Sequence, residues 1–476
     1  MKKSKRIIIH WFRQDLRLHD NPALRAAVEQ GDLLPIYILD DDNAKEHAMG
    51  QASRVWLHHS LNTLNESLEG HLRLFRGNAE EILLSLVEQY SISAIYWNRC
   101  YEPWRIRRDK QIKQQLIDNR IHVESFNSSL LWEPWEVLKK DGTPYRVFTP
   151  YFRKGCLSAR EPRKPLLSPD ELNYAKINVK GELPLSDLDL IPKTDWHQDL
   201  INHWEVGESG AQNYLDKFLI KGIDEYDEGR NFPAKQNVSR LSPYLHFGQI
   251  SVNQVWYDVK ASGDTVNQDR LLSELGWREF SYSLLYHFPE LPKQNLQPKF
   301  DRFEWLEDKH ILHKWQTGQT GYPIIDAGMR ELWQTGYMHN RVRMIVGSFL
   351  VKNLLLHWHV GEKWFWDCLV DADLASNSAS WQWIAGCGAD AAPYFRIFNP
   401  VTQGEKFDRS GEYTRKFVPE LKKLPNKYLF KPWEAPMDIL EQAGIILGKH
   451  YPKPIVEIKA SRERALLAFQ ATRVDQ

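Results

Sequence analysis

Residues 5–30 have the sequence KRIIIHWFRQDLRLHDNPALRAAVEQ, which predicts a strand, a polar turn and a helix in that order. The run Lys5–Phe12 is rich in isoleucine and aromatic residues and is followed by polar residues, which is typical of a buried strand. The helical segment is predicted over Pro22–Gln30. One strand followed by one helix is the unit from which open α/β sheets are built.

The same alternation continues to about residue 130. Buried strands are also predicted at Leu33–Leu39, His71–Phe75, Ala94–Trp97 and Ile121–Phe126. Asn78 is a suitable N-cap for the middle one of three further helices, which are predicted at Ser53–Leu68, Ala79–Tyr90 and Ile106–Asn119. This pattern predicts an α/β domain with a doubly wound parallel sheet over residues 1–130. No GxGxxG motif follows the first strand, so a dinucleotide-binding domain of the usual kind is not supported.

The composition and pattern of the sequence change at about residue 130 and again at about residue 204. Residues 131–204 are rich in proline, which breaks long elements, and predict an interdomain connector that lies over the surface. Residues 205–476 predict an all-α domain, with helices at Ala211–Ile220, Ser251–Ala261, Asp269–His287, Ile324–Thr335, Asn340–His357 and Glu362–Leu369. In Asn340–His357 the apolar residues fall at 342, 345, 346, 349, 350 and 354, which form one stripe along a helix.

Composition excludes several classes of protein. The chain has 476 residues, of which 42% are hydrophobic and 26% charged, so disorder and low complexity are excluded. Lysine and arginine total 62, as do aspartate and glutamate, so any surface that binds nucleic acid must be locally basic. The four cysteines (Cys100, Cys156, Cys368, Cys387) form no CxxC pair, which fits a reducing compartment. We find no signal peptide or membrane span and expect a cytoplasmic protein.

The chain has 19 tryptophans, concentrated in its C-terminal half. Most tryptophans pack in cores. The alternative is chemistry, in which an indole stacks on a base or a flat cofactor, or carries an electron. Composition does not decide between the two, and the position of each tryptophan must do so.

Two groups of polar residues could carry chemistry in the middle of the chain. Ser239 and Ser242 precede a helix that begins near Pro243, and hydroxyls at a helix start suit a phosphate, although they also serve as ordinary caps. Glu274, Trp277 and Arg278 lie on one helical face at spacings of three and four residues. A carboxylate, an indole and a guanidinium can together contact a base edge, a base face and a phosphate, or form a surface ion pair beside a core tryptophan.

Two later groups share this character. Asn340 and Met344 are one helical turn apart, with Arg341 and Arg343 beside them. Residues 371–383 (DADLASNSASWQW) place two acids, an amide and two tryptophans within thirteen positions. Asp371 and Asp373 could bind a metal ion, but no further ligands cluster nearby, so we expect structural carboxylates and no metal site.

At these motifs the sequence resembles the photolyase/cryptochrome family over nearly its whole length. The resemblance rests on blocks that occur in the family's order: residues 11–20 (WFRQDLRLHD), 239–244 (SRLSPY), 277–280 (WREF), 320–323 (TGYP), 338–341 (MHNR), 371–375 (DADLA) and 399–407 (NPVTQGEKF). The likeness is greatest to class I cyclobutane pyrimidine dimer DNA photolyases. It implies an N-terminal α/β domain, a long connector and a helical domain that holds FAD.

The resemblance assigns the candidate cofactor residues. The residues matching those at the FAD ribityl chain and phosphates are Tyr226, Ser239, Leu241 and Ser242. Those matching residues around the isoalloxazine are Arg343, Asp371 and Asp373, and Asn377 matches the residue that faces flavin N5. Family photolyases usually carry asparagine there, whereas plant-type blue-light receptors usually carry aspartate. The matches to the electron-transfer chain that reduces the flavin are Trp305, Trp358 and Trp381.

The resemblance also implies a pocket for the damaged bases. Its residues are Glu274, Trp277, Asn340, Met344 and Trp383, and the candidates for DNA backbone contacts are Arg230, Arg278, Arg341 and Gln403. Enzymes that repair (6-4) photoproducts carry histidine at the positions of Asn340 and Met344. The histidine pair is absent here, which favours cyclobutane dimers, flipped out of the duplex for repair.

The implied function is light-driven repair of cyclobutane pyrimidine dimers in DNA, by electron transfer from excited FADH⁻, as a deoxyribodipyrimidine photo-lyase. The alternative is a cryptochrome, a blue-light receptor with FAD and no repair activity. A second, antenna chromophore is implied for the α/β domain. The segment Tyr101–Arg105 departs from the folate-binding pattern, which argues against folate and leaves a deazaflavin, another flavin or an empty site open. We expect UV-damaged DNA as the partner, a monomer, and no obligate protein partner.

Overall fold

The computed structural model describes residues 6–391 and 395–472. Contacts between backbone positions divide the chain into two compact units. Unit 1 comprises Met1–Lys221, Ser239–Pro289 and Val370–Ala375, and unit 2 comprises Gly222–Val238, Glu290–Leu369 and Ser376–Gln476. Each compact unit therefore contains segments that are far apart in the sequence. The predicted domain boundaries at residues 130 and 204 stay a prediction.

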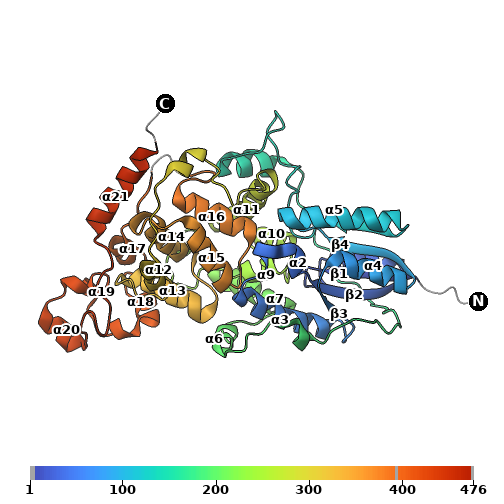
Figure 1. Ribbon diagram of the computed structural model, residues 1–476, viewed down its shortest axis with the longest axis horizontal. Helices are drawn as coiled ribbons and strands as arrows, with labels where there is room; N and C mark the ends of the chain where they lie inside the picture. Colours follow the sequence, from blue (N-terminus) through green and yellow to red (C-terminus); the bar gives the residue numbers. More distant parts are fainter. Residues whose placement is uncertain (1–5, 392–394, 473–476) are drawn as a thin grey trace, which may run out of the picture. The chain divides into compact units, whose positions relative to one another are not determined.

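Unit 1 contains a five-stranded parallel sheet with the strand order β3-β2-β1-β4-β5 (Figure 1). The strands are β1 (Ile7–Phe12), β2 (Asp32–Leu39), β3 (Arg73–Arg76), β4 (Ile92–Asn98) and β5 (His122–Phe126). The chain moves outward from β1 to β3, returns to the other side of β1 and continues to β5. The predicted doubly wound sheet is therefore confirmed, although Lys5 lies outside the described residues.

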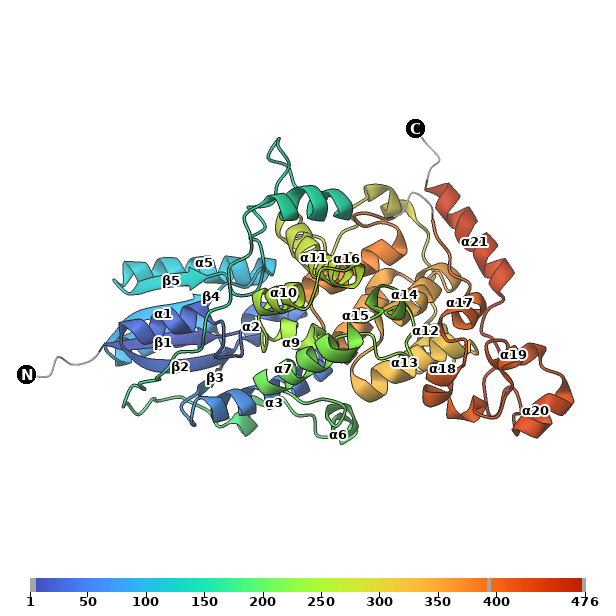
Figure 2. The same cartoon turned by 180° about the vertical axis from the view of Figure 1, so that it is seen from behind.

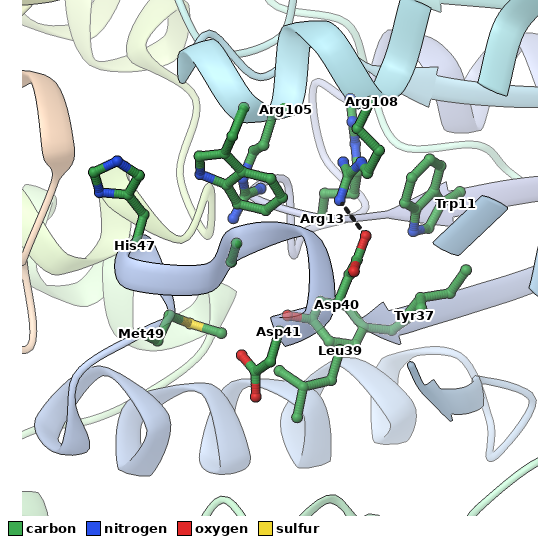
Figure 3. Close-up of a pocket in the computed structure, with 13 residues that line it drawn as sticks. Trp11, Arg13, Tyr37, Leu39, Asp40, Asp41, His47, Met49, Arg105 and Arg108 are labelled. Atoms are coloured by element: carbon green, nitrogen blue, oxygen red, sulfur yellow. Dashed lines mark hydrogen bonds and ion pairs between the residues drawn. The ribbon is translucent and has the colours of Figure 1, made fainter. Parts of the chain in front are cut away.

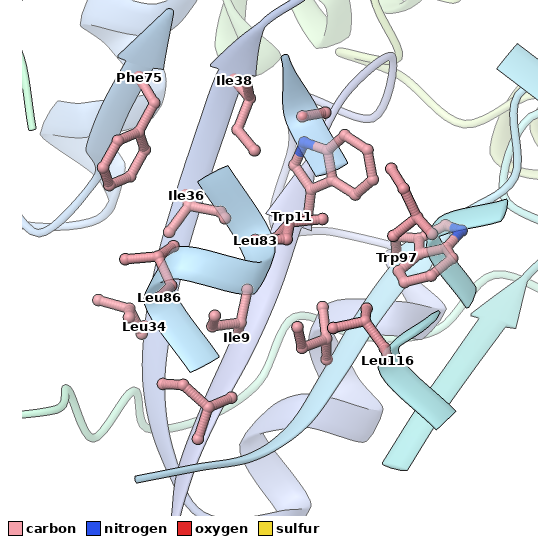
Figure 4. Packing of buried hydrophobic residues seen from close by; sticks show 14 of the residues in the cluster. Ile9, Trp11, Leu34, Ile36, Ile38, Phe75, Leu83, Leu86, Trp97 and Leu116 are labelled. Atoms are coloured by element: carbon pink, nitrogen blue, oxygen red, sulfur yellow. The ribbon is translucent and has the colours of Figure 1, made fainter. Parts of the chain in front are cut away.

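Alternate side chains of the central strand supply the core on one face of the sheet. Ile9 and Trp11 of β1 pack in a buried cluster with Leu83 and Leu86 of α4 (Ala79–Gln89) and Leu116 of α5 (Pro103–Asp118) (Figure 4). Burying each of these side chains fully stabilises the fold by about 1.5–3 kcal/mol. The strand register is fixed because a shift of one residue would move this whole set to the opposite face.

Helix α4 begins at the predicted residue, Ala79, whereas α5 begins at Pro103, three residues before the predicted start. Asn78 caps α4 by accepting a hydrogen bond from the Glu80 backbone N–H (2.9 Å), which confirms the predicted N-cap. The remaining α-helices assigned wholly to this unit are α1 (Pro22–Gln30), α2 (Asp41–Ala44), α3 (Gln51–Ser67), α6 (Trp196–Ile201), α7 (Glu208–Lys217), α9 (Ser242–His246), α10 (Val252–Ala261) and α11 (Val266–His287). The short helix α2 was not predicted, because three polar residues and one alanine carry no periodicity.

The predicted connector is not confined to the surface. Trp132, Tyr151 and Phe152 are buried, and the Phe152 ring lies where a Cβ on Gly276 of α11 would be. Tyr174 forms a parallel bridge with Leu33 of β2. The expectation of a surface connector is therefore wrong for these residues, since proline prevents long elements but does not prevent burial of the aromatic residues between them.

Unit 2 is helical in its described residues (Figure 2). Its helices are α8 (Tyr226–Gly229), α12 (Lys309–Gln316), α13 (Pro323–Thr335), α14 (Asn340–Ser348), α15 (Trp358–Cys368), α17 (Pro400–Phe407), α18 (Glu412–Phe417), α19 (Asn426–Leu429), α20 (Met437–Ala443) and α21 (Ile458–Ala471). A further helix, α16 (Leu374–Ala385), has its first two residues assigned to unit 1.

The predicted helix Asn340–His357 is wrong in its last part. Helix α14 ends at Ser348, widens into a π-helical turn at Phe349–Asn353 and gives way at Leu355, whose φ is 53°. All six residues of the apolar stripe are buried, so the periodicity continued through the break. A hydrophobic pattern reports which side chains are buried and does not report where the backbone hydrogen bonds change partner.

No helix in the described ranges is both long and apolar enough to cross a membrane. All four cysteines are buried free thiols.

One glycine allows two distant segments of unit 1 to touch. Gly248 has φ +67°, and a Cβ there would lie 2.1 Å from the carbonyl oxygen of Gln14, on the loop that follows β1. The Gly248 carbonyl oxygen also accepts a hydrogen bond from Arg17 Nη1 (2.9 Å). We predict that Gly248→Ala lowers the free energy of unfolding by more than about 2 kcal/mol, because backbone strain and a steric clash add. Urea denaturation measures this.

Gly444→Ala is the matched control for that substitution. Gly444 has a similar φ (+73°) and nothing within 4 Å of the added Cβ, so it isolates the cost of the left-handed backbone. Equal losses in the two variants would show that the close approach to Gln14 contributes nothing.

Candidate functional site

A tight turn leads into α9 and presents the first candidate cofactor residues. Arg240 has φ +54°, and the Ser239 hydroxyl accepts a hydrogen bond from the Leu241 backbone N–H (3.4 Å). Leu241 is buried and precedes Ser242, where α9 begins. The Ser242 hydroxyl donates to Asp371 Oδ2 (2.6 Å). The turn therefore places its hydroxyls in one small region of unit 1.

Asp371 and Asp373 lie in the short segment Val370–Ala375, which packs in unit 1. The Asp373 carboxylate accepts a hydrogen bond from the hydroxyl of Tyr282 on α11. His246 of α9 places its Nδ1 3.6 Å from Asp373 Oδ2. Burial, and then the charge of Asp373, raise the pKa of Tyr282 well above its ordinary value, so the phenol stays a hydrogen-bond donor. Both carboxylates are thus held in fixed orientations by neighbours from α9 and α11.

These carboxylates do not belong to a metal centre in the part of the chain that the structure describes, where no group of three or more His, Cys, Asp or Glu side chains could hold a metal ion. Their neighbours are the hydroxyl groups of Ser242 and Tyr282, which donate hydrogen bonds, and the imidazole of His246, whose Nδ1 lies 3.6 Å from Asp373 Oδ2. This donor and acceptor set fits a polar organic ligand that carries N–H and hydroxyl groups.

In unit 2, α15 fixes the amide of Asn377. Asn377 Nδ2 donates to the backbone carbonyl oxygen of Glu362 (3.1 Å), and the Ser378 hydroxyl donates to Glu362 Oε1 (2.5 Å). A backbone carbonyl only accepts, so the NH₂ group must face α15 and the Asn377 carbonyl oxygen must face away from it. Burial raises the pKa of Glu362 to about 7.

The face of α11 that carries Glu274, Trp277 and Arg278 forms as predicted. The Trp277 ring stacks on Phe148, with centroids 3.8 Å apart and planes 11° apart. Arg278 Nη1 donates to the Ser129 carbonyl oxygen (2.7 Å) and to Glu279 Oε1 (3.1 Å). One face of Trp277 is therefore occupied by the protein, and the guanidinium of Arg278 is anchored.

Helix α14 places Asn340 and Met344 one turn apart, as predicted. Arg341 Nη2 donates to Asn231 Oδ1 (2.5 Å), and Arg343 Nε donates to the Met338 carbonyl oxygen (2.7 Å). Next to them, His339 caps the helix by accepting the Arg341 backbone N–H through Nδ1 (3.2 Å).

The start of α14 is strongly electropositive. Burial, and then the charges of Arg341, Arg343 and Arg230, lower the pKa of His339 to about 3. Burial and the charge of Arg230 also lower the pKa of Arg341. Positive charges this close together repel one another, and a bound anion would lower that repulsion. The start of α14 therefore suits an anion. Arg230 itself follows α8, with its guanidinium carbon 5.6 Å from the ring centre of Tyr226.

The tryptophans of unit 2 differ in depth. Trp381 on α16 is buried and packs edge-on against Phe365 (5.0 Å between ring centroids). Trp358 at the start of α15 is fully buried, and its Nε1 donates to Asn295 Oδ1 (3.0 Å). Trp305 is partly exposed. Of the three, Trp381 and Trp358 are buried and Trp305 is accessible to solvent in part.

Two further candidates have less defined surroundings. Trp383 Nε1 donates to the Asp390 carbonyl oxygen (3.1 Å), which fixes its indole. Gln403 lies on α17, whose N-cap is Asn399.

The sequence missed the residues that orient the candidates. His246 and Tyr282 hold Asp373, Phe148 supports Trp277, and Glu362 with Ser378 lies against Asn377. Their only sequence signal is helical spacing, because His246 is four residues after Ser242 and Tyr282 is four residues after Arg278. Spacing alone does not show which partner on another element they contact.

A separate pocket opens beside the sheet of unit 1. Figure 3 shows its lining, which includes Arg13 and Arg105 with the aromatic residues Trp11, Tyr37 and Trp104. The guanidinium carbons of Arg105 and Arg108 lie 4.9 and 5.0 Å from the ring centre of Trp104, and Arg108 Nη1 donates to Asp40 Oδ2 (3.0 Å). The pocket thus includes Trp104 and Arg105, the end of the segment that the sequence singled out for a second chromophore.

Two family models match the chain. Residues 8–169 match the model described as DNA photolyase, and residues 271–471 match the model described as the FAD binding domain of DNA photolyase. A deoxyribodipyrimidine photo-lyase from Agrobacterium fabrum is 50% identical over 98% of this chain and 98% of its own length. Cryptochrome-2 of Arabidopsis thaliana is 37% identical over the whole of this chain and 80% of its own.

A solved structure of a bacterial class III photolyase from Agrobacterium tumefaciens is 49% identical, with a TM-score of 0.95 over all of this chain and 99% of that one. That relative is described as class III, whereas the sequence predicted the greatest likeness to class I enzymes. The fold, the buried carboxylates at α9 and α11 and the relatives agree, and the chain belongs to the photolyase/cryptochrome family.

Proposed function

We propose that this protein binds FAD and repairs cyclobutane pyrimidine dimers in DNA when illuminated, as a monomeric deoxyribodipyrimidine photo-lyase of the class III type. The observation that carries the proposal is the fixed amide of Asn377. Its NH₂ group is held by the Glu362 carbonyl, so its oxygen is an acceptor that can face the N5–H of a reduced flavin. An amide at this place accepts that hydrogen bond without adding a proton source.

The residues that would hold FAD follow from the donor and acceptor set. Ser239 and Ser242 at the start of α9 suit the phosphates and ribityl hydroxyls, together with Tyr226 and the backbone at Leu241. Asp371 and Asp373 suit N–H and hydroxyl groups, and Arg343 suits an electron-rich ring edge. When bound and reduced, the flavin supplies on excitation the electron that opens the cyclobutane ring, and takes it back afterwards.

The chain's own residues would position the damaged bases. Trp277 offers its remaining ring face for stacking, because Phe148 covers the other. We assign Glu274 to the polar edge of a thymine, Asn340 and Met344 to the side of the lesion, and Trp383 to a second stacking surface. Stacking and hydrogen bonding of an extruded pair offset part of the cost of unstacking it from the duplex.

Backbone contacts would come from the electropositive start of α14. Arg230 and Arg341 lie close enough for their charges to add to burial in lowering the pKa of His339. A DNA phosphate there would relieve the repulsion between them. Arg278 and Gln403 are further candidates for backbone contacts. Such contacts orient DNA without reading its sequence, and the affinity falls as salt rises.

We assign the pocket beside the sheet to a second, light-harvesting chromophore. Arg13, Arg105 and Arg108 with Trp11 and Trp104 suit a flat ring system that bears negative charge, since guanidinium groups pair with anions and the indoles stack. Folate, a deazaflavin and a second flavin all meet this description. A cryptochrome function is the second candidate, favoured by the 37% identity to a plant cryptochrome.

Substrate choice is the first test. We predict that purified protein with reduced flavin, illuminated with an oligonucleotide carrying one cyclobutane thymine dimer, restores the two thymines. An oligonucleotide with one (6-4) photoproduct should stay unchanged, because neither Asn340 nor the thioether of Met344 can exchange the proton that this repair needs. Chromatography of the digested DNA scores both. An intact dimer would favour the cryptochrome function, and repair of the (6-4) lesion would contradict the assigned pocket.

Glu274→Ala tests the lesion contact. Losing a charged hydrogen bond to the base edge should weaken binding of dimer-containing DNA by about 1.5–3 kcal/mol. Flavin absorbance of the purified variant and binding of undamaged DNA should match the wild type. A variant purified without flavin would mean that Glu274 supports the cofactor and does not contact the lesion.

The raised pKa of Glu362 predicts a dependence of stability on pH. The carboxyl has a pKa of about 7 in the folded protein, against an ordinary value of 4.5, so its contribution is complete below pH 4.5 and is lost as pH rises through 7. Glu362→Gln, whose amide oxygen still accepts from Ser378, should remove this part of the loss, on the order of 3 kcal/mol. Urea denaturation of both proteins between pH 5 and 8 measures the difference.

Comparison with the wild type is needed because burial also raises the pKa of Glu279 to about 7, and Glu279 is present in both proteins. If the two stability curves ran parallel across this range, Glu362 would be ionised throughout.

A further inference from the structure

An imidazole lies between two of the tryptophans assigned to electron transfer. The ring of His357 is 5.1 Å from the ring of Trp305 and 5.7 Å from that of Trp358, measured between centroids. Its plane is within 26° of the Trp358 plane. His357 therefore contacts both indoles, and all three residues belong to unit 2.

The backbone explains this placement. Leu306 and Leu356 form a parallel bridge, and the Leu306 N–H donates to the Leu355 carbonyl oxygen (2.8 Å). In this parallel register Trp305 lies opposite Leu355, so Trp305 and His357 share one face of the bridge and their rings meet diagonally across it.

The ring of His357 is held as one neutral tautomer. It is the N-cap of α15, where Nδ1 accepts the backbone N–H of His359 (3.1 Å), so Nδ1 is unprotonated and the ring proton is on Nε2. Burial, and then the charge of Lys363, lower its pKa. Protonation would also break the cap and place a positive charge at the positive end of the helix. The bridge between the indoles therefore carries no charge.

The surroundings of Trp358 favour passage of an electron over loss of a proton. Its Nε1–H donates to the amide oxygen of Asn295, which is not a base at neutral pH. His359 is its other neighbour, where burial, and then the proximity of His357 and Lys363, lower the pKa to about 4. A hydrogen bond to the Pro292 carbonyl acts in the opposite direction and is outweighed, so this ring is neutral too. After losing an electron, Trp358 therefore remains a radical cation, and an electron from Trp305 can reduce it again.

We propose that His357 is a positioning residue for the outer step of electron transfer, and that its ring supplies the contact through which an electron passes from Trp305 to Trp358. The electron leaves the indole of Trp305 and fills the vacancy on Trp358, while His357 is neither oxidised nor protonated. Partly exposed Trp305 then loses its Nε1 proton to water and is reduced by an external thiol. The inference rests on the proposed function, in which oxidised flavin, when excited, is the oxidant.

Two variants separate the ring of His357 from its cap. His357→Asn keeps a strong N-cap acceptor and removes the ring, whereas His357→Phe keeps a ring of similar size and removes the cap. Electronic coupling falls steeply when packed atoms are replaced by a gap. In the holoprotein with oxidised flavin, His357→Asn should therefore lower the yield of photoreduction by a thiol several-fold. His357→Phe should keep most of that yield.

Flash photolysis and thermal unfolding complete the test. After a flash, the tryptophan radical of His357→Asn should decay faster than in the wild type. The oxidised residue is then still Trp358, which recombines with the reduced flavin before Trp305 can donate an electron. The melting temperature should fall only in His357→Phe. A purely structural role predicts the reverse pattern of yields, and a wild-type yield in His357→Asn would overturn the proposal.

Trp305→Phe distinguishes failure of the bridge from failure of the chain. If Trp305→Phe abolishes photoreduction while His357→Asn leaves it unchanged, His357 is not the bridge and the electron path stands. If the flavin of Trp305→Phe is also photoreduced as in the wild type, the electron path assigned under the proposed function is wrong. The proposed role of His357 is then wrong as well.

Discussion

The hydrogen bonds that fix Asp371 and Asp373 are the constraint on which the candidate cofactor site depends. Ser242 donates to the first carboxylate and Tyr282 donates to the second, with His246 Nδ1 3.6 Å from Asp373 Oδ2, so α9, α11 and the segment Val370–Ala375 must fold together in unit 1. A buried carboxylate without such partners would be costly. The segment continues directly into α16, which carries Asn377 and Trp381, so the start of that helix is set by the same contacts.

Burial controls the protonation of the groups around the proposed electron path. It lowers the pKa values of His357 and His359 and raises that of Glu362, so each tends toward its neutral form. The arginines at α14 are charged, because a guanidinium does not lose its proton under ordinary conditions. Unit 2 therefore combines a neutral region around Trp358 with a cationic region at the start of α14. The first suits transfer of electrons without protons, and the second suits a polyanion.

Members of this family that repair DNA and members that signal share one fold, so the difference must lie in a few side chains. The proposed function assigns Asn377 to this difference, since its amide differs from an aspartate by a single ionisable group. The hydrogen bond to the Glu362 carbonyl gives that amide one orientation. The proposed function also assigns to this difference the pair Asn340 and Met344, whose side chains would restrict which lesion the proposed enzyme repairs.

The sequence alone determined the parallel sheet, because branched apolar runs separated by helical patterns have few other solutions, and it identified the family through motifs in order. It also placed Glu274, Trp277 and Arg278 on one helix face. Only the tertiary structure ended α14 at Ser348, buried part of the connector, brought Phe148 under Trp277 and placed His357 between two tryptophans. Periodicity records which side of its own element a side chain occupies. Contacts between elements depend on where the backbone hydrogen bonds change partner and on which distant segment fills the space, and neither is encoded by spacing along the chain.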